Sequence, residues 1–216
     1  MHVVVVANGD FQPGPRTLAA LRDADLVICA DGGADHVLGL GIVPHILIGD
    51  LDSTADETRR TLEDAGCQVV VFPREKDAGD TELAVQEAFL RGATRLTLLG
   101  ALGGPRADHA LANVLLLSLP MVQHIDARIV SEDSEIALVR RRIDLRGEAG
   151  QIVSLLPLTP LVEGVTTDGL LYPLSGATLR QGTTHGLSNV LVEPDARVEV
   201  GDGLLLVVKE SLRAST

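Results

Sequence analysis

The chain has 216 residues, enough for one large domain or two smaller ones around a true hydrophobic core. Its formal net charge of −12 leaves no surplus of basic side chains, which argues against nucleic acid or an anionic membrane as the partner. A small anionic substrate stays possible, because a metal ion can supply positive charge locally.

The two cysteines and the N-terminal segment bear on the cellular location. Cys29 and Cys67 stand in apolar segments and indicate buried core residues, not a disulfide framework or a cysteine metal site. The apolar run near the N-terminus, "VVVVA", is too short for a membrane span or a signal sequence. We therefore expect a cytoplasmic protein.

Short apolar segments alternate with amphipathic segments through the first half of the chain. Near-continuous Val, Ile and Leu runs are typical of strands covered on both faces of a parallel sheet. Strands are predicted at 3–8, 25–30, 45–50, 67–73 and 95–101, and helices at 15–24, 31–41, 53–66, 79–93 and 107–120. The sequence therefore predicts an α/β fold: a Rossmann-like three-layer domain with a mostly parallel sheet.

The pattern changes after Pro120, where short strand-like runs follow one another with turn residues between them and no convincing helix. The runs lie at 127–133, 135–140, 150–158, 162–174, 177–184, 189–194, 196–200 and 203–210. Such spacing is typical of an antiparallel β-sandwich. We expect two domains, an α/β nucleotide-binding catalytic domain at 1–125 and a β-sandwich domain at 126–216.

Polar residues follow the strands of the first half, where an open parallel sheet binds its ligands. The first strand ends in Asn8-Gly9-Asp10. The later strands are followed by Asp31 with Gly32 and Gly33, by Asp50 and Asp52, by Asp77 and Asp80, and by "GALGGPRADH". The sequence therefore places a candidate site at the carboxyl edge of this sheet.

Asp50 and Asp52 flank a single leucine, and carboxylates at such spacing repel each other unless a cation lies between them. Each acid alone also fits a structural role, such as helix capping for Asp77 and Asp80 or a turn for Asp31. Together, hard oxygen ligands near a glycine-rich turn favour Mg²⁺ carrying a polyphosphate. The glycine turn can approach phosphate closely, with Arg106 as the charge partner.

Four segments carry a resemblance that spans almost the whole chain. They read "ICADGGADHVLGLGIVPHILIGDLDS", "KDAGDTELA", "GALGGPRADHALAN" and, late in the chain, "GLLYPL…GLSN". In this order they resemble the motif set of the thiamine pyrophosphokinase (thiamine diphosphokinase) family. The resemblance implies transfer of pyrophosphate from ATP to the hydroxyl of thiamine, with release of AMP. It also implies an α/β domain followed by a β-sandwich, and a homodimer with thiamine bound across the subunit interface.

The resemblance assigns roles by position. It implies the catalytic residues Asp50, Asp52, Asp77 and Asp80, of which Asp50, Asp52 and Asp80 would hold Mg²⁺. For ATP it implies contacts from Asp31, Gly32, Gly33, Lys76, Gly103, Gly104, Arg106, Asp108, His109 and Asn113. For thiamine it implies contacts from Tyr172, Ser188 and Asn189. No general base is evident: Asp77 and Asp80 are expected to orient the reactants first.

Two features depart from the family pattern. Pro105 stands between the glycine pair and Arg106, so the loop is one residue longer. Tyr172 occupies the position where animal and fungal members have a tryptophan that stacks on thiamine. Tyrosine can also stack on a cationic ring, and it equally fits an ordinary core or interface aromatic.

Three alternatives remain open at this point. A pyrophosphokinase of the same fold could act on another alcohol, such as a pterin. A non-catalytic nucleotide sensor would bind ATP without releasing AMP. A sheet whose acids are only structural would show no Mg²⁺-dependent stabilisation by ATP.

Overall fold

The computed structural model describes residues 1–51, 54, 56–75 and 77–212. The chain divides into two compact units, Met1–Glu132 and Asp133–Thr216. Each unit is described by itself below.

The first unit is an α/β domain built on a parallel sheet, as the sequence predicts. Within the described residues its strands are β1 His2–Val6, β2 Leu26–Ala30, β3 Ile46–Gly49, β4 Gln68–Val71, β5 Arg95–Leu99 and β6 Asp126–Val130. They are ordered β6-β5-β1-β2-β3-β4, and every neighbouring pair is parallel. The chain order reverses between β1 and β5, which is where a sheet of this kind opens a crevice for ligands.

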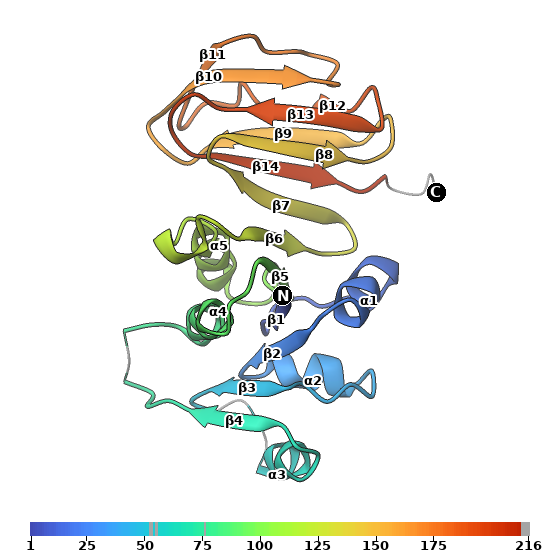
Figure 1. Cartoon of the computed structure of the whole chain (residues 1–216), viewed down its shortest axis with the longest axis vertical. Coiled ribbons are helices and arrows are strands. Elements are labelled where there is room, and N and C mark those ends of the chain that lie inside the picture. Colours follow the sequence, from blue (N-terminus) through green and yellow to red (C-terminus); the bar gives the residue numbers. More distant parts are fainter. Residues whose placement is uncertain (52–53, 55, 76, 213–216) are drawn as a thin grey trace. The chain divides into compact units, whose positions relative to one another are not determined.

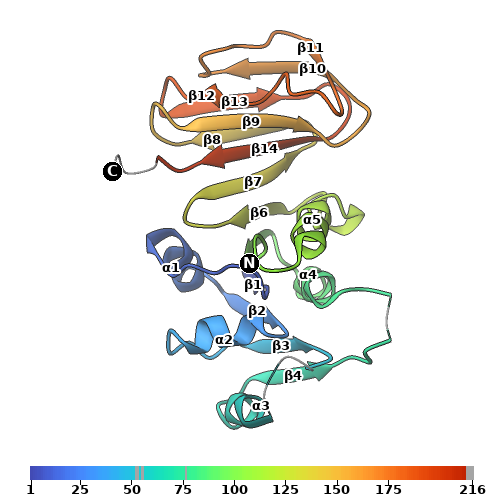
Figure 2. The ribbon, with the colours of Figure 1, turned by 180° about the vertical axis from the view of Figure 1, so that it is seen from behind.

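Helices cover both faces of this sheet (Figures 1 and 2). They are α1 Pro15–Arg22, α2 Gly33–Leu38, α3 Asp56–Asp64, α4 Asp80–Leu90, α5 Ala107–Leu116 and a 3₁₀ turn, η1, at Pro120–Val122. Leu21, Val37 and Leu62 from the first three helices share a core with Val4 and Val6 of β1. Helix α4 packs against β1, β2 and β3 with buried Ala84 and Ala88. The three-layer prediction is confirmed.

The second unit is a sandwich of two antiparallel sheets. Its strands are β7 Ser134–Val139, β8 Arg142–Arg146, β9 Ile152–Pro157, β10 Leu161–Asp168, β11 Ala177–Arg180, β12 Asn189–Val190, β13 Asp195–Glu199 and β14 Leu205–Glu210. One sheet has the order β12-β9-β14-β7 and the other β11-β10-β13-β8. Leu155 and Val207 from the first sheet share a core with Leu145, Val165 and Val198 from the second. The predicted β-sandwich is confirmed.

Three details of the second half differ from the sequence prediction. The sequence prediction did not include strand β8, because Ile143 and Leu145 alternate with charged residues and suggest a loop. In the structure this segment is a strand because it pairs with β13. The predicted strand at 162–174 ends at Asp168, where Gly169 has φ +73° and turns the chain. The first unit reaches Glu132 instead of residue 125, because β6 pairs with β5.

Both cysteines are free and buried, as predicted. Among the described residues, no helix is both long enough and apolar enough to cross a membrane.

Candidate active site

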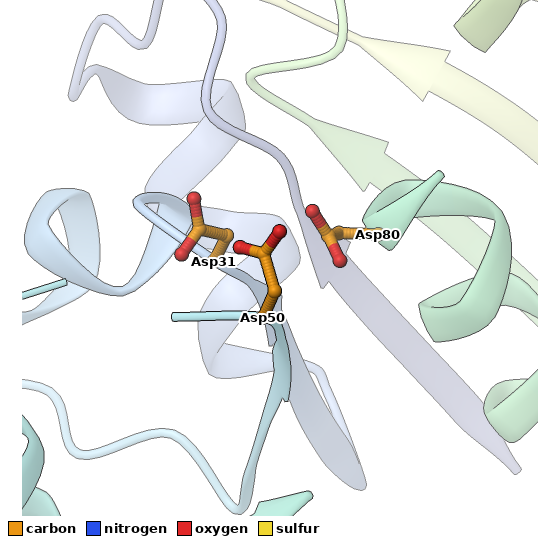
Figure 3. Close-up of side chains that lie close together, drawn as sticks. All are labelled: Asp31, Asp50 and Asp80. Atoms are coloured by element: carbon orange, nitrogen blue, oxygen red, sulfur yellow. The ribbon is translucent and has the colours of Figure 1, made fainter. Parts of the chain in front are cut away.

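Three aspartates meet at the carboxyl edge of the parallel sheet. Asp31 follows β2, Asp50 follows β3 and Asp80 begins α4. Each offers a carboxylate oxygen, and these oxygens all lie within 4.8 Å of one another. Figure 3 shows the three carboxylates facing a common space. We call this group the aspartate triad.

The backbone around Asp31 is shaped to bring its carboxylate to this edge. Asp31 adopts a left-handed φ of +44°, and its amide donates to the Ile48 carbonyl oxygen at 2.8 Å. A Cβ on Gly49 would lie 3.1 Å from the Asp31 Cβ, so the glycine leaves room for the aspartate. The Thr54 hydroxyl donates to Asp31 Oδ1 at 3.3 Å and helps to orient the carboxylate.

Leu51, directly after Asp50, is also left-handed, with φ +60°. This conformation is costly for a bulky L residue and persists only where the surrounding structure enforces it. A left-handed residue between Asp50 and Asp52 redirects the chain straight after the strand. The predicted metal ligand Asp52 and the predicted ATP contact Lys76 lie outside the described residues.

The triad is chemically suited to a hard divalent cation. Asp31 is buried and its two partners are half-buried, so the mutual repulsion of three carboxylates is less screened than at an open surface. Carboxylate oxygens are the ligands that Mg²⁺ prefers. The residues present therefore fit Mg²⁺. Asp77, also predicted here, is exposed and outside the triad.

A glycine loop follows β5 on the other side of the crevice. Gly100, Gly103 and Gly104 all have positive φ, which a non-glycine residue adopts only with strain. The buried Asn113 of α5 donates from Nδ2 to the Ala101 carbonyl oxygen at 2.9 Å. Asn113, predicted to lie next to the ATP phosphates, thus stabilises the glycine loop through this hydrogen bond to its backbone.

Arg106 and Asp108 form an exposed pair at the start of α5. Arg106 Nε donates to Asp108 Oδ1 at 2.9 Å and Nη2 donates to Oδ2 at 2.6 Å. The hydrogen bond from Arg106 lowers the pKa of Asp108 to about 2. Asp108 therefore orients the guanidinium in this structure. His109 is exposed on the same helix turn.

The predicted thiamine residues form a second site, in the second unit. Tyr172 is 64% exposed on the segment after β10. Asn189 is buried and uses its amide on this segment: Oδ1 accepts from the Tyr172 amide at 3.0 Å, and Nδ2 donates to the Tyr172 carbonyl oxygen at 2.7 Å. Ser188 is left-handed, with φ +58°, and its amide donates to Ser154 Oγ at 3.1 Å. Asn189 thus positions Tyr172.

Sequence reasoning left two residues out of the candidate site. Thr54, which bonds Asp31, lies between uninformative helix-start residues and gave no signal. Asp10 was noted at the end of the first strand without a role, yet it lies against Gly103 of the glycine loop. Gly32 and Gly33 cap and begin α2, directly after Asp31, and both are buried.

Two family models match the chain. The one described as thiamin pyrophosphokinase, catalytic domain, matches residues 18–129. The one described as thiamin pyrophosphokinase, vitamin B1 binding domain, matches residues 140–205.

Known proteins resemble the chain over nearly its whole length. A thiamine pyrophosphokinase of Bacillus subtilis is 28% identical over 209 residues, covering 96% of this chain and 97% of the relative. The crystal structure of a B. subtilis thiamine pyrophosphokinase superposes with a TM-score of 0.86 at 28% identity, covering 98% of this chain and 99% of the other. A thiamin pyrophosphokinase family protein from Enterococcus faecalis superposes with a TM-score of 0.85 at 26% identity, covering 99% and 100%.

Proposed function

We propose a mechanism for this chain, which belongs to the thiamin pyrophosphokinase family. Membership makes it an ATP:thiamine diphosphotransferase, which forms thiamine diphosphate and AMP. The new bond joins the thiamine hydroxyl oxygen to the β-phosphorus of ATP. The bond from that phosphorus to the oxygen of the α-phosphate breaks, AMP leaves, and the hydroxyl loses its proton.

The observation that carries the proposal is the aspartate triad. Asp31, Asp50 and Asp80 would hold Mg²⁺, with Asp52 as a further predicted ligand. Bound there, Mg²⁺ would neutralise polyphosphate charge and assist the departure of AMP. The triad also gives this edge the negative charge that suits the positively charged thiazolium ring of thiamine.

The glycine loop and the start of α5 would bind the polyphosphate. Gly104 lacks a side chain, so phosphate can approach its backbone closely, whereas the Asp10 carboxylate lies where a side chain on Gly103 would be. Helix α5 runs over ten residues, from Ala107 to Leu116, and its N-terminus adds favourable partial positive charge. Arg106 would exchange Asp108 for phosphate when ATP binds, because a guanidinium forms bidentate bonds with either group. Phosphoryl transfer of this kind depends mainly on positioning and charge neutralisation.

Tyr172 would stack on thiamine, held in place by Asn189. We also propose a homodimer with thiamine at the subunit interface. In support of it, apolar side chains around β12 are exposed: Ile152, Leu171, Leu187 and Val192. An exposed apolar patch is typical of an interaction surface. The two free cysteines fit a reducing, cytoplasmic location.

An AMP-release assay tests the reaction. ATP, Mg²⁺ and thiamine are each omitted in turn, and thiamine diphosphate is measured beside AMP. We expect both products only when all three components are present. ATP binding without AMP release would favour the nucleotide sensor. AMP release with a pterin alcohol but not with thiamine would favour the other pyrophosphokinase. An absent Mg²⁺ requirement would contradict the role of the triad.

A further inference from the structure

The segment between β1 and α1, residues 8–14, has no role in the mechanism above, and hydrogen bonds hold it at both ends. We call it the crossing segment. At its start, the Gly9 amide donates to the Gly100 carbonyl oxygen at 2.7 Å, and the Asp10 amide donates to the Leu102 carbonyl oxygen at 2.8 Å. The crossing segment is therefore bonded directly to the loop that follows β5.

Glu132, just after β6, fastens the other end. Its Oε1 accepts from the Thr17 amide at 2.8 Å and lies 2.9 Å from the Thr17 hydroxyl, while Oε2 lies 3.4 Å from the Arg16 amide. Thr17 Oγ1 in turn accepts from the Gly14 amide at 3.0 Å. Helix α1 has no acid in its own first turn, so Glu132 supplies the negative charge that stabilises a helix N-terminus.

Helix α2 contacts the crossing segment at Gly9 and, in its middle, at Phe11. His36 Nε2 lies 3.1 Å from the Gly9 carbonyl oxygen. The rings of Phe11 and His36 stack with their centroids 5.1 Å apart. The segment is thus attached at its start, middle and end to three different parts of the first unit.

This arrangement spans the two halves of the candidate site. A methyl group on Gly32, next to the triad residue Asp31, would collide with the Asn8 side chain. A methyl group on Gly103 of the glycine loop would collide with the Asp10 carboxylate. The crossing segment also lies after β1, at the strand-order reversal where ligands enter such sheets.

We infer that the crossing segment is a further wall of the ATP site, facing the nucleoside, and that Glu132 is the positioning residue for it. The inference rests on the proposed function. Asn8 and Asp10 are exposed and offer an amide and a carboxylate. The Asp10 carboxylate repels phosphate but accepts hydrogen bonds from hydroxyl groups, so this wall suits ribose and base.

Two variants remove the Glu132 anchor by different means. Glu132→Gln keeps the shape but places an amide NH₂ among backbone donors. Gly14→Ala is compatible with the extended φ of −148°, yet its methyl group would displace the Glu132 carboxylate. Gly39→Ala is the matched control, because its methyl group would lie 3.4 Å from the nearest atom, the Asp35 carbonyl oxygen, at an ordinary helical φ of −59°.

The experiment measures calorimetric affinity for Mg²⁺ with a non-hydrolysable ATP analogue, for AMP and for inorganic triphosphate, alongside amide exchange at residues 8–17. We expect both anchor variants to bind the analogue and AMP about fivefold more weakly, with faster exchange in that segment, because positioning is lost. Triphosphate binding, kcat at saturating ATP and KM for thiamine should stay unchanged, and Gly39→Ala should match the wild type.

Wild-type affinity for the analogue in both anchor variants, whatever their melting temperatures, would overturn the inference. Equal weakening for triphosphate would overturn the assignment to the nucleoside. A wild-type protein that binds the analogue but releases no AMP contradicts only the proposed reaction. A wild-type protein that does not bind the analogue contradicts both.

Discussion

The outer face of β8 and β13 and the carboxyl edge of the parallel sheet both concentrate charged side chains, but they arrange them differently. On β8, Asp144 lies 2.9 Å from Arg142 and 3.1 Å from Arg197 of β13, while Asp195 lies 3.5 Å from Arg146. In the triad, by contrast, like charges from three separate elements converge within 4.8 Å. Alternating opposite charges stabilise a solvated sheet face, whereas converging like charges indicate a cation site.

Backbone strain also distinguishes the carboxyl edge of the parallel sheet from the face of β8 and β13. In the described part of the chain, the non-glycine residues with positive φ are Asp31, Leu51 and Ser188. Asp31 belongs to the triad, Leu51 directly follows its member Asp50, and Ser188 precedes Asn189. Strands β8 and β13 contain none. Strained conformations cluster where structure serves a ligand, so this supports the two proposed sites independently of their charges.

The largest effect is expected when one carboxylate is removed from each region. Asp50→Asn should lower kcat by about a hundredfold or more, because electrostatic stabilisation of the transferred phosphates is lost. Added Mg²⁺ should raise the melting temperature of this variant less than that of the wild type, because one ligand of the cation is lost. AMP release and thermal melting measure both effects. Asp144→Asn, the matched control, should leave turnover unchanged; equal losses of turnover in the two variants would contradict the catalytic role of the triad.

The second-unit site should respond differently. Tyr172→Ala should raise KM for thiamine about tenfold through lost stacking on a cationic ring, with KM for ATP unchanged. Tyr172→Phe keeps the ring and should retain wild-type KM for thiamine. Steady-state kinetics with each substrate varied in turn makes the distinction. If the phenylalanine variant behaves like the alanine variant, the hydroxyl acts and stacking is not the mechanism.

A smaller effect is expected behind the glycine loop. Asn113→Ala should lower the free energy of unfolding by about 1–2 kcal/mol, because the Ala101 carbonyl oxygen loses its buried donor. KM for ATP should rise as the loop loosens. Ser118→Ala removes an exposed, local hydrogen bond to the Leu115 carbonyl oxygen, just after α5, and should leave KM for ATP unchanged. Urea unfolding and steady-state kinetics with ATP are measured for both variants. An unchanged KM for ATP in Asn113→Ala would show that Asn113 stabilises the fold without affecting ATP binding.

The smallest effect concerns the opposite edge of the sheet, where His2 is buried between Thr97 and Arg95. Burial lowers the pKa of His2 below its ordinary value of 6.5. The neutral form is favoured in the folded state, so its contribution to stability is complete above pH 6.5 and is lost as pH falls toward the lowered pKa. The free energy of unfolding should therefore fall between pH 7 and pH 5, and His2→Gln should remove the part of this fall that His2 causes, about 1 kcal/mol or less. Urea unfolding at each pH measures it. Parallel pH profiles for the two proteins would contradict it.

Sequence reasoning was most successful where local signals agree with the fold. The apolar strands and terminal glycines of the first unit placed Asp31, Asp50 and Asp80 on successive loops, and a parallel sheet brings such loops to one edge. The convergence of the three carboxylates depends on the left-handed φ of Asp31 and Leu51, which their residue types do not predict. Strand β8 was missed for a related reason: its charged residues become strand residues only beside the complementary charges of β13.

Roles carried by long-range contacts were the least predictable. Glu132 meets Thr17 across 115 residues, and Asn189 meets Tyr172 across 17. That Asn189 faces thiamine stays a prediction, and its amide bonds to the Tyr172 backbone are contacts that the sequence does not indicate. Side chains that act through another residue leave no local pattern in sequence, since their partners are chosen by the folded chain.

The most direct measurement is a calorimetric titration of Mn²⁺, as a stand-in for Mg²⁺, into the wild type, Asp31→Asn, Asp50→Asn and Asp144→Asn, with the ATP analogue bound. We expect one class of tight sites in the wild type and in Asp144→Asn, and affinity weakened at least about tenfold in both triad variants. Equal affinity in all four proteins would contradict the claim that converging carboxylates at the sheet edge hold the catalytic metal.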